Sequence, residues 1–213
     1  MLTEPESSKA IQEVAKTTDT LLNIIKDFTK FIGKISGITG DGLEGKIEDN
    51  LKFSRWERRA RLIERYNKVS FGQTIKILPP KFLIPLIESA TLEDEDNLQD
   101  LWINLLTSFT IEGYNVEKRS AYIEILKSLT SIDAKILKNI YEYDTEQKKE
   151  SGALYSISKK KMNYSPEDEI SLDNLYRVGC LKNSTTHEGI EGEAFSITFL
   201  GISFVEACIN IKK

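Results

Sequence analysis

A long segment in the middle of the chain, "LPPKFLIPLIESATLEDEDNLQDLWINLLTSF", sets the strongest constraint on the fold. Its second half places large apolar residues three and four positions apart, which is the period of one helical face. The residues at this spacing are Leu98, Leu101, Trp102, Leu105, Leu106 and Phe109. Because such a face must be buried against other elements, the pattern predicts a core helix over residues 92–109 and a mainly α fold.

The start of this helix carries an acidic run of four residues, Glu93, Asp94, Glu95 and Asp96. Thr91 precedes Asp94 by three residues, so the spacing predicts a capping box with Thr91 as the N-cap. Carboxylates in a first turn are stabilised by the helix dipole, whereas successive helical residues point about 100° apart and form no ready-made catalytic pair. The favoured interpretation is a charged helix start, and a metal or catalytic role is the alternative.

A second helix, residues 43–69, contains "FSRWERRARLIERY", the only densely basic stretch of the chain. Trp56 belongs to its apolar stripe and is a predicted core residue. The arginines have three interpretations: a solvated face paired with acidic neighbours, a contact for anions or nucleic acid, or a contact for a protein partner. Together with the acidic run they form the candidate interaction surface, which comprises Arg55, Arg58, Arg59, Arg61, Glu93, Asp94, Glu95 and Asp96.

An amphipathic helix is predicted over residues 9–35, after a flexible tail at 1–8. Its apolar residues include Phe28, Phe31, Ile32 and Ile35, and lysines 26, 30 and 34 line another face. The favoured interpretation is packing on the rest of the protein or on a second copy. The alternative is a helix that lies on a membrane with its lysines toward anionic head groups.

The C-terminal part reads as helix, loop, short helix, strand, turn, strand and closing helix, which is the order of a winged helix. Thr130 or Ser131 is expected to cap one helix, and Ser171 to cap a short helix that Gly179 ends. "CLKN" and "AFSITF" predict the two strands of a hairpin. The candidate second helix and its lead-in, "SPEDEISLDNLYRVG", are acidic and contain one arginine. Repulsion from phosphates therefore favours a structural or protein-binding role over DNA reading.

These segments predict a helical bundle over residues 9–117 followed by a winged-helix-like domain over 118–213. The net charge of −4 disfavours general nucleic-acid binding. Two cysteines and one histidine are too few ligands for a zinc site, and no cofactor or small-molecule substrate is expected. The first residues lack the pattern of a signal peptide, and no apolar run is long enough to span a bilayer, so a cytoplasmic protein is expected.

The chain resembles a bacterial family called abortive infection alpha. The resemblance rests on "FSRWERRARLIERY", the long central segment, "SAYIEILKSLTSIDAKIL" and "ITFLGISFVEAC", which together span roughly residues 45 to 210. It implies a mostly helical bacterial protein associated with defence against phage, in which an infected cell stops growing or dies before phage matures. The family offers no catalytic motif that can be carried over to residues of this chain.

Three functional hypotheses follow. The first is a non-enzymatic antiphage protein that binds a protein partner or itself, because no nucleophile–base pair and no phosphate-binding loop is found. The second is a membrane-active effector that uses helix 9–35 at the inner membrane. The third is a nucleic-acid binder or magnesium-dependent nuclease that uses Arg55, Arg58 and Arg59 with the acidic run.

Overall fold

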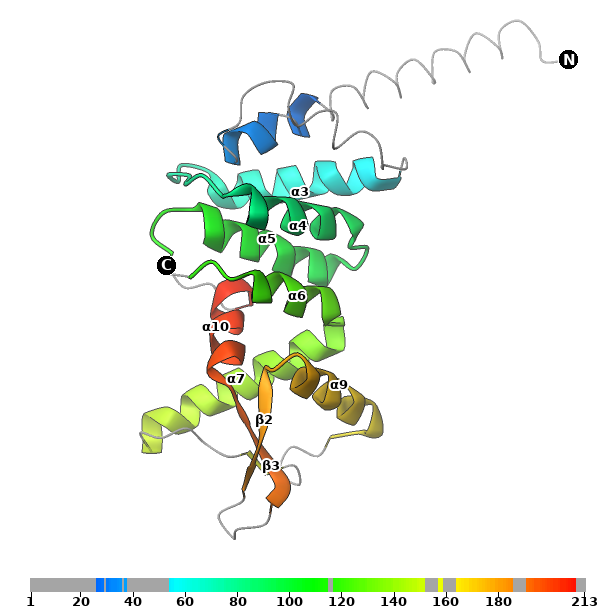
Figure 1. Cartoon of the computed structure of the whole chain (residues 1–213), viewed down its shortest axis with the longest axis vertical. Coiled ribbons are helices and arrows are strands. Elements are labelled where there is room, and N and C mark those ends of the chain that lie inside the picture. The colour runs from blue at the N-terminus through cyan, green and yellow to red at the C-terminus, as the bar shows by residue number, and fades with distance from the viewer. Residues whose placement is uncertain are drawn as a thin grey trace, which may run out of the picture. The chain divides into compact units, whose positions relative to one another are not determined.

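The computed structural model describes residues 26–28, 30–35, 37, 54–114, 117–151, 157–158, 164–185 and 191–209. This structure is mostly helical, with a small antiparallel sheet near the C-terminal end (Figure 1). It confirms the predicted fold class, mainly α with a short β-hairpin. The chain divides into two compact units, Met1–Leu92 (unit 1) and Glu93–Lys213 (unit 2).

Unit 1 contains α3 (Ser54–Ser70) and α4 (Pro80–Leu92), together with a helical segment at residues 26–28 and 30–35. The apolar side chains of that segment are buried, and the Phe31 ring lies edge-on to Tyr66 of α3 with 5.3 Å between centroids. The backbone N–H of Leu78 donates to the Ile35 carbonyl at 2.8 Å. For the described part of helix 9–35, the structure therefore shows packing within unit 1.

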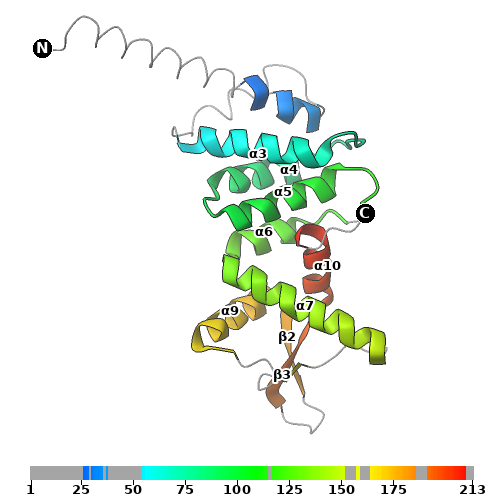
Figure 2. The ribbon, with the colours of Figure 1, turned by 180° about the vertical axis from the view of Figure 1, so that it is seen from behind.

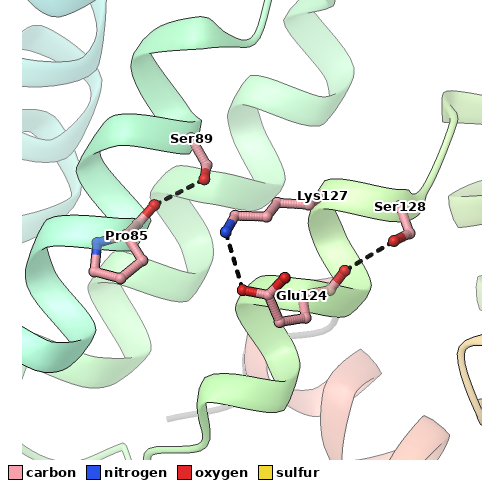
Figure 3. Close-up of polar contacts among 5 residues, drawn as sticks. All are labelled: Pro85, Ser89, Glu124, Lys127 and Ser128. Carbon is pink, nitrogen blue, oxygen red and sulfur yellow. Dashed lines mark hydrogen bonds and ion pairs between the residues drawn. The ribbon is translucent and has the colours of Figure 1, made fainter.

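Helix α4 runs through Pro85 as one element. Proline has no N–H for the helical ladder, and it is best tolerated in the first turn of a helix. Ser89 lies one turn later, and its hydroxyl donates to the Pro85 carbonyl at 2.7 Å (Figure 3). Thr91 lies in the last turn of the same helix, so it cannot begin the next one.

Unit 2 has its core around α5 (Asp96–Thr110), α6 (Ser120–Ser128), α7 (Ser131–Ser151) and α10 (Phe199–Cys208). Tyr122 of α6 joins Phe109 of α5 to Phe204 of α10, with ring centroids 6.3 and 6.2 Å away. Leu98, Trp102, Leu105, Leu106 and Phe109 are all buried, and Leu101 is half-buried. Within α6, Lys127 pairs with Glu124 at 2.9 Å (Figure 3).

The division between the units lies 25 residues before the boundary expected at 117/118. The difference concerns α5, which packs against α10 although the two are about a hundred residues apart in sequence. Asn104 of α5 donates its side-chain amide to the Cys208 carbonyl at 3.0 Å. The predicted domains, 9–117 and 118–213, stay a prediction about which parts fold independently.

The sheet of unit 2 consists of β1 (Ile157–Ser158), β2 (Leu181–Thr185) and β3 (Glu191–Ile197) in the order β1-β3-β2. Both pairings are antiparallel, with Ile157 opposite Phe195 and Leu181 opposite Ile197. Helix α9 (Pro166–Arg177) precedes β2 and packs on α7 (Figures 1 and 2). Gly179, at a φ of +77°, lets the chain turn from the end of α9 into β2, as predicted.

Thr198 and Gly201 fix the start of α10 against the junction of α9 and β2. The Thr198 hydroxyl donates to the Gly179 carbonyl at 2.6 Å and accepts from the Gly201 N–H at 2.9 Å. A Cβ at position 201 would lie 2.4 Å from the Cys180 carbonyl oxygen, so only glycine permits this approach.

Candidate interaction surface

The arginines of α3 do not form one exposed surface. Arg59 is only 3% exposed, and its guanidinium carbon lies 4.5 Å from the centre of the Phe28 ring. Arg58 is half-buried and donates to the Leu92 carbonyl at 2.6 Å, while Arg61 is exposed. The prediction that Arg59 belongs to an interaction surface is therefore corrected, because it packs inside unit 1. The side chains of Arg55 and Trp56 lie outside the described residues.

The acidic run does not have the predicted capping geometry. The Thr91 hydroxyl donates backward to the Ile87 and Glu88 carbonyls, at 2.9 and 3.1 Å, so Thr91 is not the N-cap of α5. Glu95 occupies that position and makes no side-chain capping bond. Helix α5 begins at Asp96, four residues later than predicted, because the end of α4 extends through Leu92.

Two of the carboxylates are engaged close to the chain. Glu93 accepts from the backbone N–H groups of Asp94 and Glu95, at 3.0 and 3.1 Å. Glu95 accepts a hydrogen bond from the Ser131 hydroxyl at the start of α7. These contacts fix the turn before α5 and do not converge on a shared site. The arginines and the acidic run belong to different units, and their pairing stays a prediction.

A more coherent exposed surface lies on α9. The helix begins at Pro166, five residues before the start expected from Ser171, which is buried. Its N-cap is Ser165, whose hydroxyl accepts from the Asp168 N–H at 3.2 Å while the Asp168 carboxylate accepts from the Ser165 N–H at 2.9 Å. This capping box leaves the first turn with three acidic residues near the positive end of the helix dipole.

Along α9, exposed and buried residues recur with the helical period, so the helix has one exposed side and one buried side. Ser171, Leu172 and Leu175 point into the unit. The opposite side comprises Pro166, Glu167, Glu169, Ile170, Asp173 and Arg177, called the α9 face. Ile170 is 72% exposed in the middle of this face, with carboxylates on both sides. An exposed isoleucine surrounded by charge serves neither the core nor a helix cap.

Asn174 fixes the position of α9 on the rest of unit 2. Its amide nitrogen donates to the Ser128 carbonyl and to the Asp133 carboxylate, both at 2.7 Å. Its amide oxygen accepts from Arg177 at 2.7 Å. Asp133 is 2% exposed and also accepts from the Thr130 N–H at 2.8 Å, so Thr130 is the predicted cap of α7. The α9 face is therefore presented by a helix anchored to α6 and α7.

A family model matches most of the chain. The family is described as Abortive infection alpha, and the match covers residues 54–208, from the first residue of α3 to the last residue of α10. The chain belongs to the abortive infection alpha family. The resemblance drawn from the sequence is thereby confirmed, and the family's name suggests a role in abortive infection. No curated protein and no solved structure matches the chain.

The two thiols of this abortive infection alpha protein are both buried in unit 2. Burial raises the pKa of Cys180 to about 12 and holds the pKa of Cys208 well above its ordinary value. Since the thiolate is the nucleophile, neither side chain is prepared for covalent chemistry at neutral pH. Among the described residues, no group of three or more His, Cys, Asp or Glu side chains is placed to hold a metal ion.

Two tyrosines, one just before α9 and one in its last turn, are also far from titration near neutral pH. Burial, followed by the charges of Asp168 and Tyr176, raises the pKa of Tyr164 to about 12. Burial likewise raises the pKa of Tyr176.

Within the ranges the structure describes, no helix is long and apolar enough to cross a membrane.

Sequence reasoning missed Ile170 because it placed the helix start at Ser171. The signal was present in "SPED", where Ser165 stands three residues before Asp168 with proline at the first helical position. A helix that starts there puts Ile170 opposite Leu172 and Leu175. The helical period then assigns Ile170 to the exposed side of the helix.

Proposed function

We propose that this abortive infection alpha protein acts against phage in the bacterial cytoplasm without catalysing a reaction, by binding a protein partner through the α9 face. The family name supports the biological setting. The observation that carries the mode of action is Ile170, exposed at the centre of an acidic helix face. Protein interfaces combine an apolar anchor with a polar rim, and this face has both.

The arrangement of α7, β1, α9, β2 and β3 supports a winged-helix interpretation of unit 2. In DNA-binding members of that architecture, the helix in the position of α9 enters the major groove. Here Glu167, Glu169 and Asp173 would face the phosphates, and each would add repulsion. A protein partner with basic residues around an apolar pocket fits the same face without that cost.

Two further observations favour binding over the alternative hypotheses. The described apolar residues of helix 9–35, Phe28, Phe31, Ile32 and Ile35, are buried in unit 1. Insertion of this helix into a membrane would have to break that packing. Glu93 and Glu95 accept hydrogen bonds from their own turn and from Ser131, which supports a structural role for the acidic run rather than a nuclease site.

The test is phage plating on bacteria that carry the gene with its neighbours. The variant Glu169→Lys/Asp173→Lys reverses the charge of the α9 face and leaves Ile170 in place. The matched control, Glu112→Lys/Glu146→Lys, makes the same charge change at exposed positions of unit 2 outside α9. We expect the α9 variant to lose protection and the control to keep it. Equal protection by both, at equal protein levels, would contradict the proposal.

A further inference from the structure

Unit 1 exposes large apolar side chains around the connection between α3 and α4. Phe71 is 86% exposed, Ile77 is 63% exposed and Val69 is 42% exposed. Phe71 lies in a turn closed by the Gln73 N–H, which donates to the Ser70 carbonyl at 3.0 Å, and Gly72 adopts a φ of +69° there. The turn holds the Phe71 ring away from the buried residues of α3.

These residues lie at one end of unit 1, where two helical segments finish together. Phe28 lies against Arg59 and Phe31 against Tyr66, so the segment at 26–35 runs in the same direction as α3 (Figures 1 and 2). Ile77 meets the end of that segment, because a Cβ on Gly37 would be 2.8 Å from its side chain. The sequence 71–77 thus connects the ends of both helical segments.

The same end of the unit is basic. Lys34, Lys68 and Lys76 are exposed there, on the helical segment, on α3 and beside Ile77. Lys68 pairs with Glu64 at 2.7 Å, but both side chains are largely exposed, so water and salt screen this pair. Asp27 lies about two helical turns before Lys34, toward the other end of the segment.

We propose that this basic apolar end, Lys34, Lys68, Val69, Phe71, Lys76 and Ile77, docks on the surface of an anionic lipid bilayer. Phe71 and Ile77 enter the interface between head groups and acyl chains, and the lysines face the anionic head groups. The contact leaves Phe28, Phe31, Ile32 and Ile35 in their packed positions. It therefore needs no unfolding of the helix that the sequence suggested for the membrane.

Charge favours a lipid surface over a second copy of the chain as the occupant. Two copies that met through this end would bring their lysines together, and like charges repel. Anionic head groups attract the same lysines and cover a flat area, which suits side chains that protrude from a turn. The affinity expected from two apolar side chains and three lysines is modest and reversible.

The test is sedimentation of the full chain with vesicles made of equal parts phosphatidylglycerol and phosphatidylcholine, beside vesicles of phosphatidylcholine alone. We expect binding to the anionic vesicles only, weakened by salt. Phe71→Glu should lower the partition coefficient by about tenfold to a hundredfold. Lys34→Gln and Lys76→Gln should each lower it by about fivefold. Ile170→Glu makes the same kind of change at an exposed isoleucine of unit 2 and should have no effect.

Three results would overturn the proposal: no binding to anionic vesicles, binding that Phe71→Glu leaves unchanged, or equal binding to both vesicle types. A dimer in sedimentation equilibrium that Phe71→Glu converts to a monomer, without vesicle binding, would assign the basic apolar end to a second copy instead. Circular dichroism and thermal melting establish that each variant is folded. Since Phe71 is 86% exposed, its replacement should not disturb the core.

Discussion

The two units each expose apolar side chains, but in opposite electrostatic surroundings. In unit 1, Phe71 and Ile77 lie among lysines, whereas in unit 2 Ile170 lies among carboxylates. Burying an apolar side chain favours contact with any apolar surface, whereas the charges around it determine which partner binds there. This difference in surrounding charge is why we propose different partners for the two surfaces, anionic lipid for the one on unit 1 and a basic protein for the one on unit 2.

The largest loss of stability is expected from a substitution in the core of unit 2, and without that core the α9 face would not be presented at all. Trp102 is 1% exposed and lies on α5, the helix that packs against α10. Trp102→Ala should lower the free energy of unfolding by about 3–5 kcal/mol, because it removes a large buried side chain and leaves a cavity. Urea denaturation followed by far-UV circular dichroism measures the loss. A change below about 1 kcal/mol would mean that α5 is not the core element.

A smaller loss is expected when α9 is detached from its support. Asn174→Ala removes both hydrogen bonds to Ser128 and Asp133 and leaves the buried carboxylate with one donor fewer. The unfolding free energy should fall by about 2 kcal/mol. Asn139→Ala, at an exposed asparagine on α7, is the matched control and should change it by less than about 0.5 kcal/mol. Equal effects would argue against Asn174 as the anchor of the α9 face.

The capping box at the start of α9 should contribute less again. Ser165→Ala removes the acceptor for the Asp168 N–H and should cost about 1 kcal/mol. Thr91→Val removes the hydroxyl at the position wrongly predicted to cap α5 and should leave the start of α5 unchanged, because that hydroxyl donates to the Ile87 and Glu88 carbonyls of α4. Hydrogen exchange at the first amides of each helix separates the two cases, and faster exchange in α5 of the Thr91 variant would restore the original prediction.

Acid provides a finer test of the same cap. The hydrogen bonds from Ser165, first from its N–H, lower the pKa of Asp168 below its ordinary value of 3.8. A lowered pKa means that the stabilisation is complete above pH 3.8 and is lost as the pH falls through the folded-state pKa. The stability difference between wild type and Asp168→Asn should therefore be present at neutral pH and shrink in acid. A difference that grows in acid would contradict the assigned cap.

The smallest effect on stability is expected at the exposed apolar residues themselves. Phe71→Ser and Ile170→Ser should each change the unfolding free energy by less than about 0.5 kcal/mol, because both side chains are already in water. Thermal melting checks this. A large destabilisation at either position would show that the side chain packs against the protein in solution. That side chain could then not serve as an exposed contact for a partner.

Sequence periodicity predicted the elements that depend on local pattern. Leu98, Trp102, Leu105 and Phe109 follow one helical face, and the strand period around Phe195 and Ile197 marks β3. It could not predict contacts between distant segments. Arg59 appeared as a surface charge because nothing in α3 reveals that Phe28, 31 residues earlier, covers it. The packing of α5 on α10 is a second such contact, because the two helices are far apart in the sequence and meet only in the folded chain.

Short signals failed where one residue type serves two purposes. Thr91 and Ser171 both looked like helix caps, because a hydroxyl that can accept from a free N–H can equally donate to a carbonyl in the preceding turn. Thr91 does the latter, with the Ile87 carbonyl. At Ser165 the proline that follows removes this ambiguity, since proline favours the first helical position. Context of two or three residues therefore separates a true cap from a helical serine or threonine.

The most direct test of the central claim is photo-crosslinking from the α9 face during infection. A photoreactive amino acid replaces Ile170, and in the control it replaces Asn139, an exposed residue of α7. We expect one discrete protein adduct from position 170 in infected cells, lost when Glu169→Lys/Asp173→Lys is added and absent from position 139. An adduct with nucleic acid, or no adduct that depends on the acidic residues, would contradict the proposed role of the α9 face.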